Sequence, residues 1–428
     1  MTAIVGVLNK HAVAIAADSA VTMGDTHKVV NSGNKIFTLS KYHPVAIMTY
    51  NAADFMGTPW EIIIKQYRKQ LGNSSKPHIN DYINDFIDYL YKQNYLLTDE
   101  VQHSALFFQL FFLYKTCFDR AFQKACDQRV QFNPSDPNTI SMIKKEMEYI
   151  NTISLGKGLC DDFKDYNLAD FQKFSKKEFD TLFQNNVIPI PMVIPLNERE
   201  WFEECSFNYL RSKFAITAFT GLVFTGYGNE DIYPSIMALK ISLFVDGKLK
   251  YYVENDRTCI VSDKNNACIA PFAQDDVIQT IMGGMYPGFG EIIEKVVKNS
   301  VIAYTNKVKK LAQSSPQYMG IIDELNKFDN DAFVNIMNSS IKKQMFEKYT
   351  KQLIGTVANL GKEDMANMAE SFISLTSLVR RMSPHEETVG GPVDVAVISK
   401  GDGFIWINRK HYFKPEYNPQ FFDNYYNM

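Results

Sequence analysis

The chain opens with two short apolar runs separated by a polar pair, a pattern typical of a β-hairpin. The runs are residues 2–9 and 12–18, with Lys10 and His11 between them. A third apolar run, residues 44–48, follows a polar loop. We expect these runs to be strands of a sheet, so that the start of the chain is held in place instead of fraying.

After this third run, the apolar residues recur at the spacing of a helix. Thr58 with Glu61 three residues later has the form of a capping box, and Pro59 stands where a first helical residue would. This predicts a helix that continues to Leu71. From residue 72 to about 213 the apolar residues recur at three and four positions, above all in 81–91 and 99–130, which predicts further helices. Three prolines in 186–196 indicate an extended linker.

Strand character returns from residue 215. We expect strands in 215–228, 234–245 and 249–253, with Asp246 and Gly247 as the hairpin turn between the last two. Residues 291–378 have helical spacing again, and 393–398 with 404–407 predict a closing hairpin. The glycine-rich stretch 283–290 lacks the Lys-Ser/Thr of a phosphate-binding loop, so we interpret it as a plain loop.

Three residues at the ends of the first strands are of the types that nucleophilic catalysis needs. Thr2 has a hydroxyl, and once Met1 is removed its own α-amine, with an ordinary pKa of about 8, can act as the base that the hydroxyl needs. The small side chain at position 2 permits this removal by methionine aminopeptidase. Lys35 beside the amine would keep it neutral by like-charge repulsion, and a buried Asp18 would hold that lysine in place.

The opening segment, TAIVGVLNKHAVAIAADSAVTMGD followed by NKIF, resembles the start of a mature proteasome β subunit. It is also similar to the bacterial proteasome-like peptidase that partners an ATP-driven unfoldase. The resemblance implies that Thr2 is the nucleophile, that Asp18 is the partner of the lysine, and that Lys35 lowers the pKa of the amine or hydroxyl. It also implies that the backbone of Thr22 pairs with the substrate strand.

Later segments match the same family at fewer positions. The backbone amide of Tyr50 or Asn51 stands where the family has the glycine amide of the oxyanion hole. The stretch before the closing hairpin is similar to the family motif D-x-x-S-G-G, with Glu386 at the aspartate position and Val389 at the serine position. A second family serine, expected near residues 273–274, is missing.

Composition excludes several classes of protein. The chain has 428 residues, 46% of them hydrophobic, and a net charge of -3 without a basic stripe, so we expect no nucleic-acid partner. Its most apolar window, 105–114, is too short to span a membrane, and no secretory signal is apparent. Six cysteines without a C-x-x-C pair indicate free thiols, a cytoplasmic location and no metal site.

The resemblance implies an α+β fold, the four-layer αββα sandwich of N-terminal-nucleophile (Ntn) hydrolases, with two large helical insertions. We expect the core in residues 1–71, 212–290 and 385–428, the last including a C-terminal tail, and the insertions in 72–211 and 291–384. The implied function is that of a threonine peptidase that cleaves peptide or amide bonds without a cofactor. The implied partners are a peptide or polypeptide substrate, further copies in a ring-shaped homo-oligomer, and an ATP-driven unfoldase.

Two alternatives stay open at this stage. The missing serines fit a catalytically silent scaffold or partner-binding subunit of the same fold. Insertions that close off the pocket fit a small-molecule amidase.

Overall fold

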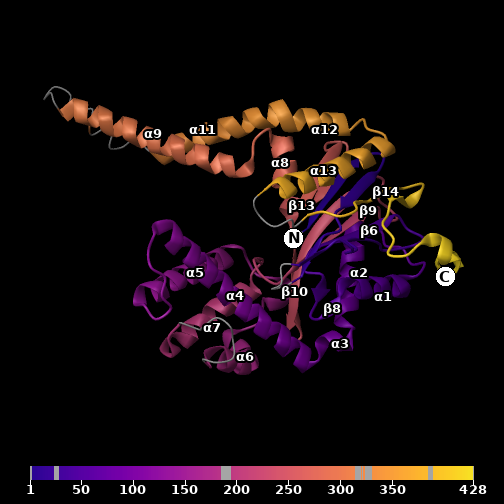
Figure 1. The fold of residues 1–428 in the computed structure, drawn as a ribbon, viewed down its shortest axis with the longest axis horizontal. Coiled ribbons are helices and arrows are strands. Elements are labelled where there is room, and N and C mark those ends of the chain that lie inside the picture. Colours follow the sequence, from indigo (N-terminus) through magenta and orange to yellow (C-terminus); the bar gives the residue numbers. More distant parts are fainter. Residues whose placement is uncertain are drawn as a thin grey trace. The chain divides into compact units, whose positions relative to one another are not determined.

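The computed structural model describes residues 2–23, 28–184, 194–313, 320, 322, 330–383 and 389–427, and the chain divides into two compact units (Figure 1). The first unit comprises Met1–Gly33, Val261–Val397 and Trp406–Met428. The second comprises Asn34–Ile260 and Ile398–Ile405. The fold is α+β, with sheets whose main strand pairs are antiparallel.

The first strand of the chain lies inside a five-stranded sheet. The strand order is β13 (Ala267–Ala273), β1 (Ala3–Asn9), β2 (Val13–Ala17), β14 (Asp394–Ser399), β15 (Gly403–Asn408). The opening and closing hairpins predicted from the sequence are therefore confirmed. The side-chain oxygen of Asn9 accepts hydrogen bonds from the amides of His11 (2.9 Å) and Ala12 (3.3 Å), which closes the first turn.

Helices cover one face of this sheet. Ala3, Val5 and Val7, at alternate positions of β1, share a buried apolar cluster with Phe372 and Ile373. The last two belong to α13 (Lys362–Met382), and α8 (Asp276–Gly283) and α12 (Lys351–Val357) also contribute to this cluster. Because every residue of β1 and β2 is buried, both faces of these strands are covered.

A helical hairpin extends from the first unit (Figure 1). It consists of α9 (Pro287–Gln313) and α11 (Asn330–Met345), followed by a π-helical turn, Phe346–Thr350, that leads into α12. The remaining elements of this unit are β3 (Val21–Met23), β4 (Lys28–Val30), a 3-10 turn at Pro415–Tyr417 and α14 (Pro419–Asn427).

The second unit has its own sheet. The order is β11 (Lys248–Val253), β10 (Ser235–Val245), β9 (Thr220–Gly226), β6 (Val45–Asn51), β5 (Ile36–Thr38), with β12 (Cys259–Ile260) paired to β10. Helices α1 (Trp60–Leu71) and α2 (Ile79–Tyr91) share a buried cluster with these strands. The predicted turn is confirmed, since Asp246 and Gly247 have φ of 51° and 70°, as a two-residue hairpin turn requires.

More helices follow α2 and form a second apolar core, in which Tyr114, Phe179 and Phe202 are fully buried. They are α3 (Asn94–Leu97), α4 (Asp99–Gln128), α5 (Pro137–Gly156), α6 (Leu168–Phe183) and α7 (Arg199–Arg211), with 3-10 turns at Asp161–Phe163 and Leu196–Glu198. The helices predicted in 81–91 and 99–130 are confirmed as α2 and α4. Of the predicted linker, residues 186–193 lie outside the described part of the chain.

Two local predictions are wrong. Thr58 does not cap a helix, because Thr58 and Pro59 form β8 and pair with β7 (Asp54–Phe55) across a tight turn, so that α1 begins at Trp60. The glycine-rich loop is shorter than expected. Gly284, with φ of 72°, ends α8, and Pro287 already begins α9.

No helix in the described ranges is both long and apolar enough to cross a membrane.

Candidate active site

Thr2 directly precedes β1 and is 6% exposed. Its carbonyl accepts a hydrogen bond of 3.1 Å from the amide of Gln274, which follows β13. Since β1 lies between β13 and β2, the first residues are held on both sides by strand pairing. Met1 lies outside the described residues.

Asp18 lies beside this end of β1. The register pairs Ile4 with Ala17, so Asp18, the next residue of the chain, is opposite Ala3. One carboxylate oxygen accepts a hydrogen bond from the amide of Ala3 (2.9 Å), and the amide of Asp18 donates to the carbonyl of Ala3 (3.2 Å). The carboxylate therefore hydrogen-bonds to the peptide unit that joins Thr2 to Ala3.

The second carboxylate oxygen of Asp18 also has backbone partners. It accepts hydrogen bonds from the amides of Ala20 (3.0 Å) and Gly390 (3.3 Å). Asp18 is only 1% exposed, and a buried carboxylate requires such charge-assisted bonds. Negative charge is thus fixed one residue away from Thr2.

The two glycines before β14 complete this part of the site. The carbonyl of Gly390 accepts from the amide of Ser19 (3.0 Å), and the Ser19 hydroxyl donates to the carbonyl of Pro392. Gly391 has φ of 75°, and a Cβ there would lie 2.8 Å from Cβ of Asn31. Only glycine fits at that position without strain.

The other predicted site residues are placed as follows. Thr22 belongs to β3, where it pairs with Val29 of β4. Glu386 lies outside the described residues. Lys35, Tyr50 and Asn51 belong to the second unit, so their position beside Thr2 stays a prediction.

Within the second unit, Lys35 is 5% exposed and its carbonyl accepts from the amide of Thr49 (2.9 Å). The Tyr50 hydroxyl donates to Glu254 (2.9 Å), and burial together with this carboxylate raises the pKa of Tyr50. Asn51 has φ of 71°, a conformation that glycine adopts easily and asparagine tolerates.

The sequence interpretation missed a charged clamp beside Thr2. Arg380 of α13 donates from Nε to the side-chain oxygen of Gln274 and from Nη2 to Asp276. Ala273, opposite Ala3, has φ of 64°, so the chain turns sharply where β13 ends. The missing serine pointed to residues 273–274, but no local signal points to an arginine 106 residues further along the chain.

Within the described residues, no group of three or more His, Cys, Asp or Glu side chains is arranged to hold a metal ion.

The chain is similar in structure to known proteins, but not in sequence. No protein-family model and no curated protein matches the chain. A solved structure titled as a Gly-1 mutant of Anbu from Hyphomicrobium sp. strain MC1 is similar over 100% of this chain and 96% of that chain, with 7% sequence identity and a TM-score of 0.26. Anbu is a bacterial proteasome-like Ntn hydrolase, the class that residues 2–37 resemble.

Proposed function

We propose that the chain is a threonine hydrolase of peptide or amide bonds, of the proteasome-like Ntn type, active once Met1 has been removed. The observation that carries the proposal is the position of Thr2 directly before β1, a buried interior strand of the five-stranded sheet. There the buried Asp18 carboxylate accepts a hydrogen bond of 2.9 Å from the adjacent amide, that of Ala3. A hydroxyl, an amine and a fixed carboxylate are the groups that this chemistry needs.

In the proposed reaction the Thr2 hydroxyl attacks the substrate carbonyl, while the α-amine of Thr2 or a bridging water takes its proton. The carbon–nitrogen bond breaks, the leaving amine receives the proton, and an ester with Thr2 remains for water to hydrolyse. Lys35, held by Asp18, lowers the pKa of the amine or hydroxyl. Glu386 is an accessory carboxylate.

The proposal also includes how the substrate binds. Backbone amides at Tyr50 and Asn51 stabilise the oxyanion, and an extended peptide pairs with the backbone at Thr22. The four-layer αββα sandwich of Ntn hydrolases, with two helical insertions, is part of the same proposal. A ring-shaped homo-oligomer in the cytoplasm, with an ATP-driven unfoldase as partner, belongs to the same proposal.

One observation favours the second candidate, a catalytically silent scaffold. Val389 stands where the family motif has a serine, and it is fully buried in the apolar cluster under α13. Its side chain has no polar atom for proton transfer.

The decisive experiment combines intact mass with an electrophilic probe. We expect purified protein to lack Met1 and to form one covalent adduct with a β-lactone or epoxyketone probe, because these react with terminal threonines. Thr2→Ala removes the hydroxyl and abolishes the adduct. Thr376→Ala removes another buried hydroxyl of the same unit, bonded within its own helix to Phe372, and keeps the adduct.

Retention of Met1 together with absence of an adduct indicates the silent scaffold. An adduct that survives Thr2→Ala places the nucleophile elsewhere. If the enzyme labels, hydrolysis that rises with peptide length supports the peptidase, and hydrolysis of short amides alone supports the small-molecule amidase.

A further inference from the structure

Polar side chains line up across four strands of the second sheet. Tyr50 of β6 pairs with Gly221 of β9, and Gly221 pairs on its other side with Lys240 of β10. Lys240 pairs in turn with Tyr252 of β11, and Glu254 follows two residues further along the chain. Because residues paired across strands direct their side chains to the same face of a sheet, Tyr50 and Lys240 can both reach Glu254.

Glu254 joins these side chains in a network that is largely buried. Its Oε2 accepts a hydrogen bond of 2.9 Å from the Tyr50 hydroxyl, and its Oε1 lies 3.0 Å from Nζ of Lys240. Tyr50 is 6% exposed, and the side chain of Glu254 is 10% exposed. The Tyr50 ring lies over β9, where a Cβ on Gly221 would come within 1.9 Å of its Cζ. A residue larger than glycine at position 221 would therefore displace the ring.

Phe219, which directly precedes β9, connects this network to the end of β6. Its ring meets the Tyr50 ring edge to face, with centroids 6.5 Å apart, and Nζ of Lys240 lies 4.8 Å from its centroid. The carbonyl of Phe219 accepts hydrogen bonds from the side-chain amide of Asn51 (2.7 Å) and the backbone amide of Ala52 (3.3 Å). The network therefore fixes the residue that in turn holds Asn51 and Ala52.

Asn51 is the residue whose backbone needs this support. Its φ of 71° is a left-handed conformation that costs free energy for a residue other than glycine, and it persists where surrounding contacts impose it. Successive amides of a strand point to opposite sides, and the amide of Thr49 donates to the carbonyl of Lys35 (2.9 Å). The amide of Asn51 therefore points to the side of Lys35, and that of Tyr50 points toward β9.

We propose that Tyr50 and Glu254 are positioning residues that hold the backbone amide of Asn51 in place as the donor to the oxyanion. The inference rests on the proposed hydrolase. The Tyr50 hydroxyl takes no part in the chemistry. Without its bond to Glu254 the ring is no longer fixed over β9, Phe219 loses a fixed neighbour, and the left-handed turn relaxes. An amide displaced in this way stabilises the oxyanion less, although the substrate still binds.

Amide hydrogen exchange of the full-length protein tests whether the network holds the end of β6. Tyr50→Phe removes the hydroxyl, and Glu254→Leu removes the carboxylate. In each variant we expect exchange at Ala52, whose amide donates to Phe219, to become about tenfold faster, with exchange in β1 unchanged. The double variant is expected to exchange no faster than Glu254→Leu, because the hydroxyl acts through this carboxylate.

Steady-state hydrolysis of a peptide tests whether the position of Asn51 serves the reaction. Because a displaced amide weakens binding of the oxyanion and not of the substrate, we expect kcat to fall about tenfold in both variants with KM unchanged. The rate is divided by the amount of protein that the β-lactone probe labels at completion. A partly unfolded sample then does not imitate the result.

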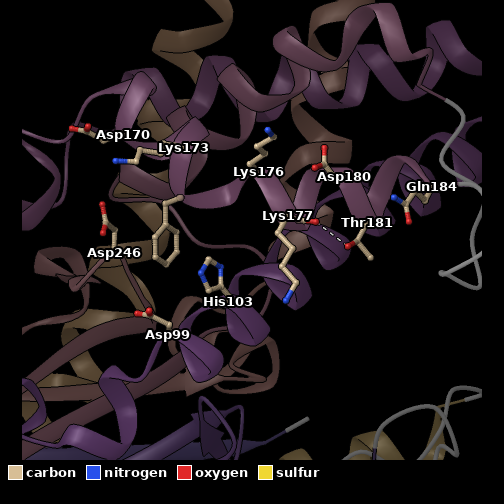
Figure 2. A pocket seen from close by; sticks show the side chains of 11 residues that line it. Asp99, His103, Asp170, Lys173, Lys176, Lys177, Asp180, Thr181, Gln184 and Asp246 are labelled. Carbon is tan, nitrogen blue, oxygen red and sulfur yellow. Dashed lines mark hydrogen bonds between the residues drawn. The ribbon is translucent and has the colours of Figure 1, made fainter.

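Two matched controls remove the same groups elsewhere in the second unit. Tyr67→Phe removes a buried hydroxyl of α1 that donates to Asp85 (2.7 Å). Glu178→Leu removes a buried carboxylate of α6, which packs on α4 and α7. This carboxylate faces the ring of His103, 3.0 Å from its Nδ1, beside a cavity among these helices (Figure 2). Both controls are expected to keep the wild-type exchange at Ala52 and the wild-type kcat.

The two measurements separate failure of the inference from failure of the hydrolase. Wild-type exchange at Ala52 in Tyr50→Phe and Glu254→Leu overturns the inference, whether or not the protein hydrolyses peptides. Wild-type kcat in both variants of an active protein overturns it as well. A wild-type protein that hydrolyses no peptide overturns the hydrolase and with it the oxyanion role of Asn51, and faster exchange at Ala52 then still shows that the network holds this segment.

Discussion

At the scale of single residues, a buried charge is stable only where hydrogen bonds replace the water it has lost. Asp18 meets this condition, since three backbone amides reach its two oxygens. Lys250 does not. It is 1% exposed, and it donates to the carbonyl of Tyr209 at 2.6 Å and lies over the ring of Tyr209. Burial lowers the pKa of Lys250 to about 7.

The lowered pKa of Lys250 predicts a pH-dependent cost to stability. The unfolded chain binds the proton up to a pKa near 10.5 and the folded chain only up to about 7, so stability rises with pH between these values. Lys250→Met should remove this slope and stabilise the protein at pH 7 by about 1–4 kcal/mol. The carbonyl of Tyr209 keeps a hydrogen-bond donor in this variant, because it also accepts a hydrogen bond from the Ser212 hydroxyl (2.9 Å).

Denaturant unfolding of both proteins at pH 7 and at pH 9.5 measures the effect. A Lys250→Met variant that is less stable at pH 7, or that keeps the wild-type pH slope, would show that the lysine is well accommodated.

At the scale of elements, the sequence predicts what is local and misses what joins distant segments. The opening hairpin, α2, α4 and the turn at Asp246 are predictable because strand alternation, helical spacing and turn chemistry act over a few residues. The same signals place Thr2 and Asp18 at neighbouring strand ends. The contact of Arg380 with Gln274 joins α13 to the end of β13 and has no local signature.

The Arg380 clamp predicts a local change in stability. Arg380→Gln removes the charge-assisted contacts to Gln274 and Asp276. At this partly exposed site these contacts contribute about 1–2 kcal/mol to the free energy of unfolding. We expect amide hydrogen exchange to become about tenfold faster at Gln274 and in α8, with α2 unchanged. The amide of Gln274 is the group that bonds to the carbonyl of Thr2.

Arg409→Gln is the control, since Arg409 stacks on Trp406 in another part of the same unit. Unchanged exchange at Gln274 in the Arg380 variant would mean that the backbone turn at Ala273 suffices to hold this segment.

At the scale of the whole molecule, helical spacing in the sequence predicted the helices of 291–378 but not how they are arranged. Among the described helices of residues 291–378, α12 and α13 carry the buried apolar residues that join the core under the first sheet. The α9–α11 hairpin has few buried residues among those described, namely Thr305, Ala312 and Val334. Many apolar residues of that hairpin are exposed. Their periodicity therefore predicts a helix, but it does not predict which element the helix packs against.

The structure therefore predicts that the hairpin can be removed without loss of the fold. Its two ends meet, because the Thr350 hydroxyl donates to the carbonyl of Met282 (2.9 Å) and a Cβ on Gly284 would lie 2.7 Å from the ring of Tyr349. Replacing residues 285–348 by a short glycine-serine linker should reduce helical circular dichroism yet shift the melting temperature by only a few degrees.

Deletion of α2 is the contrasting control. Its Tyr82, Phe86 and Leu90 are fully buried in the core of the second unit, so this deletion should abolish cooperative unfolding. If the hairpin deletion also lost its cooperative transition, the hairpin would have to stabilise the first unit through contacts other than the apolar core around α13. Near-wild-type melting would instead show that the unit which holds Thr2 and Asp18 folds around its sheet, with the hairpin as a separate appendage.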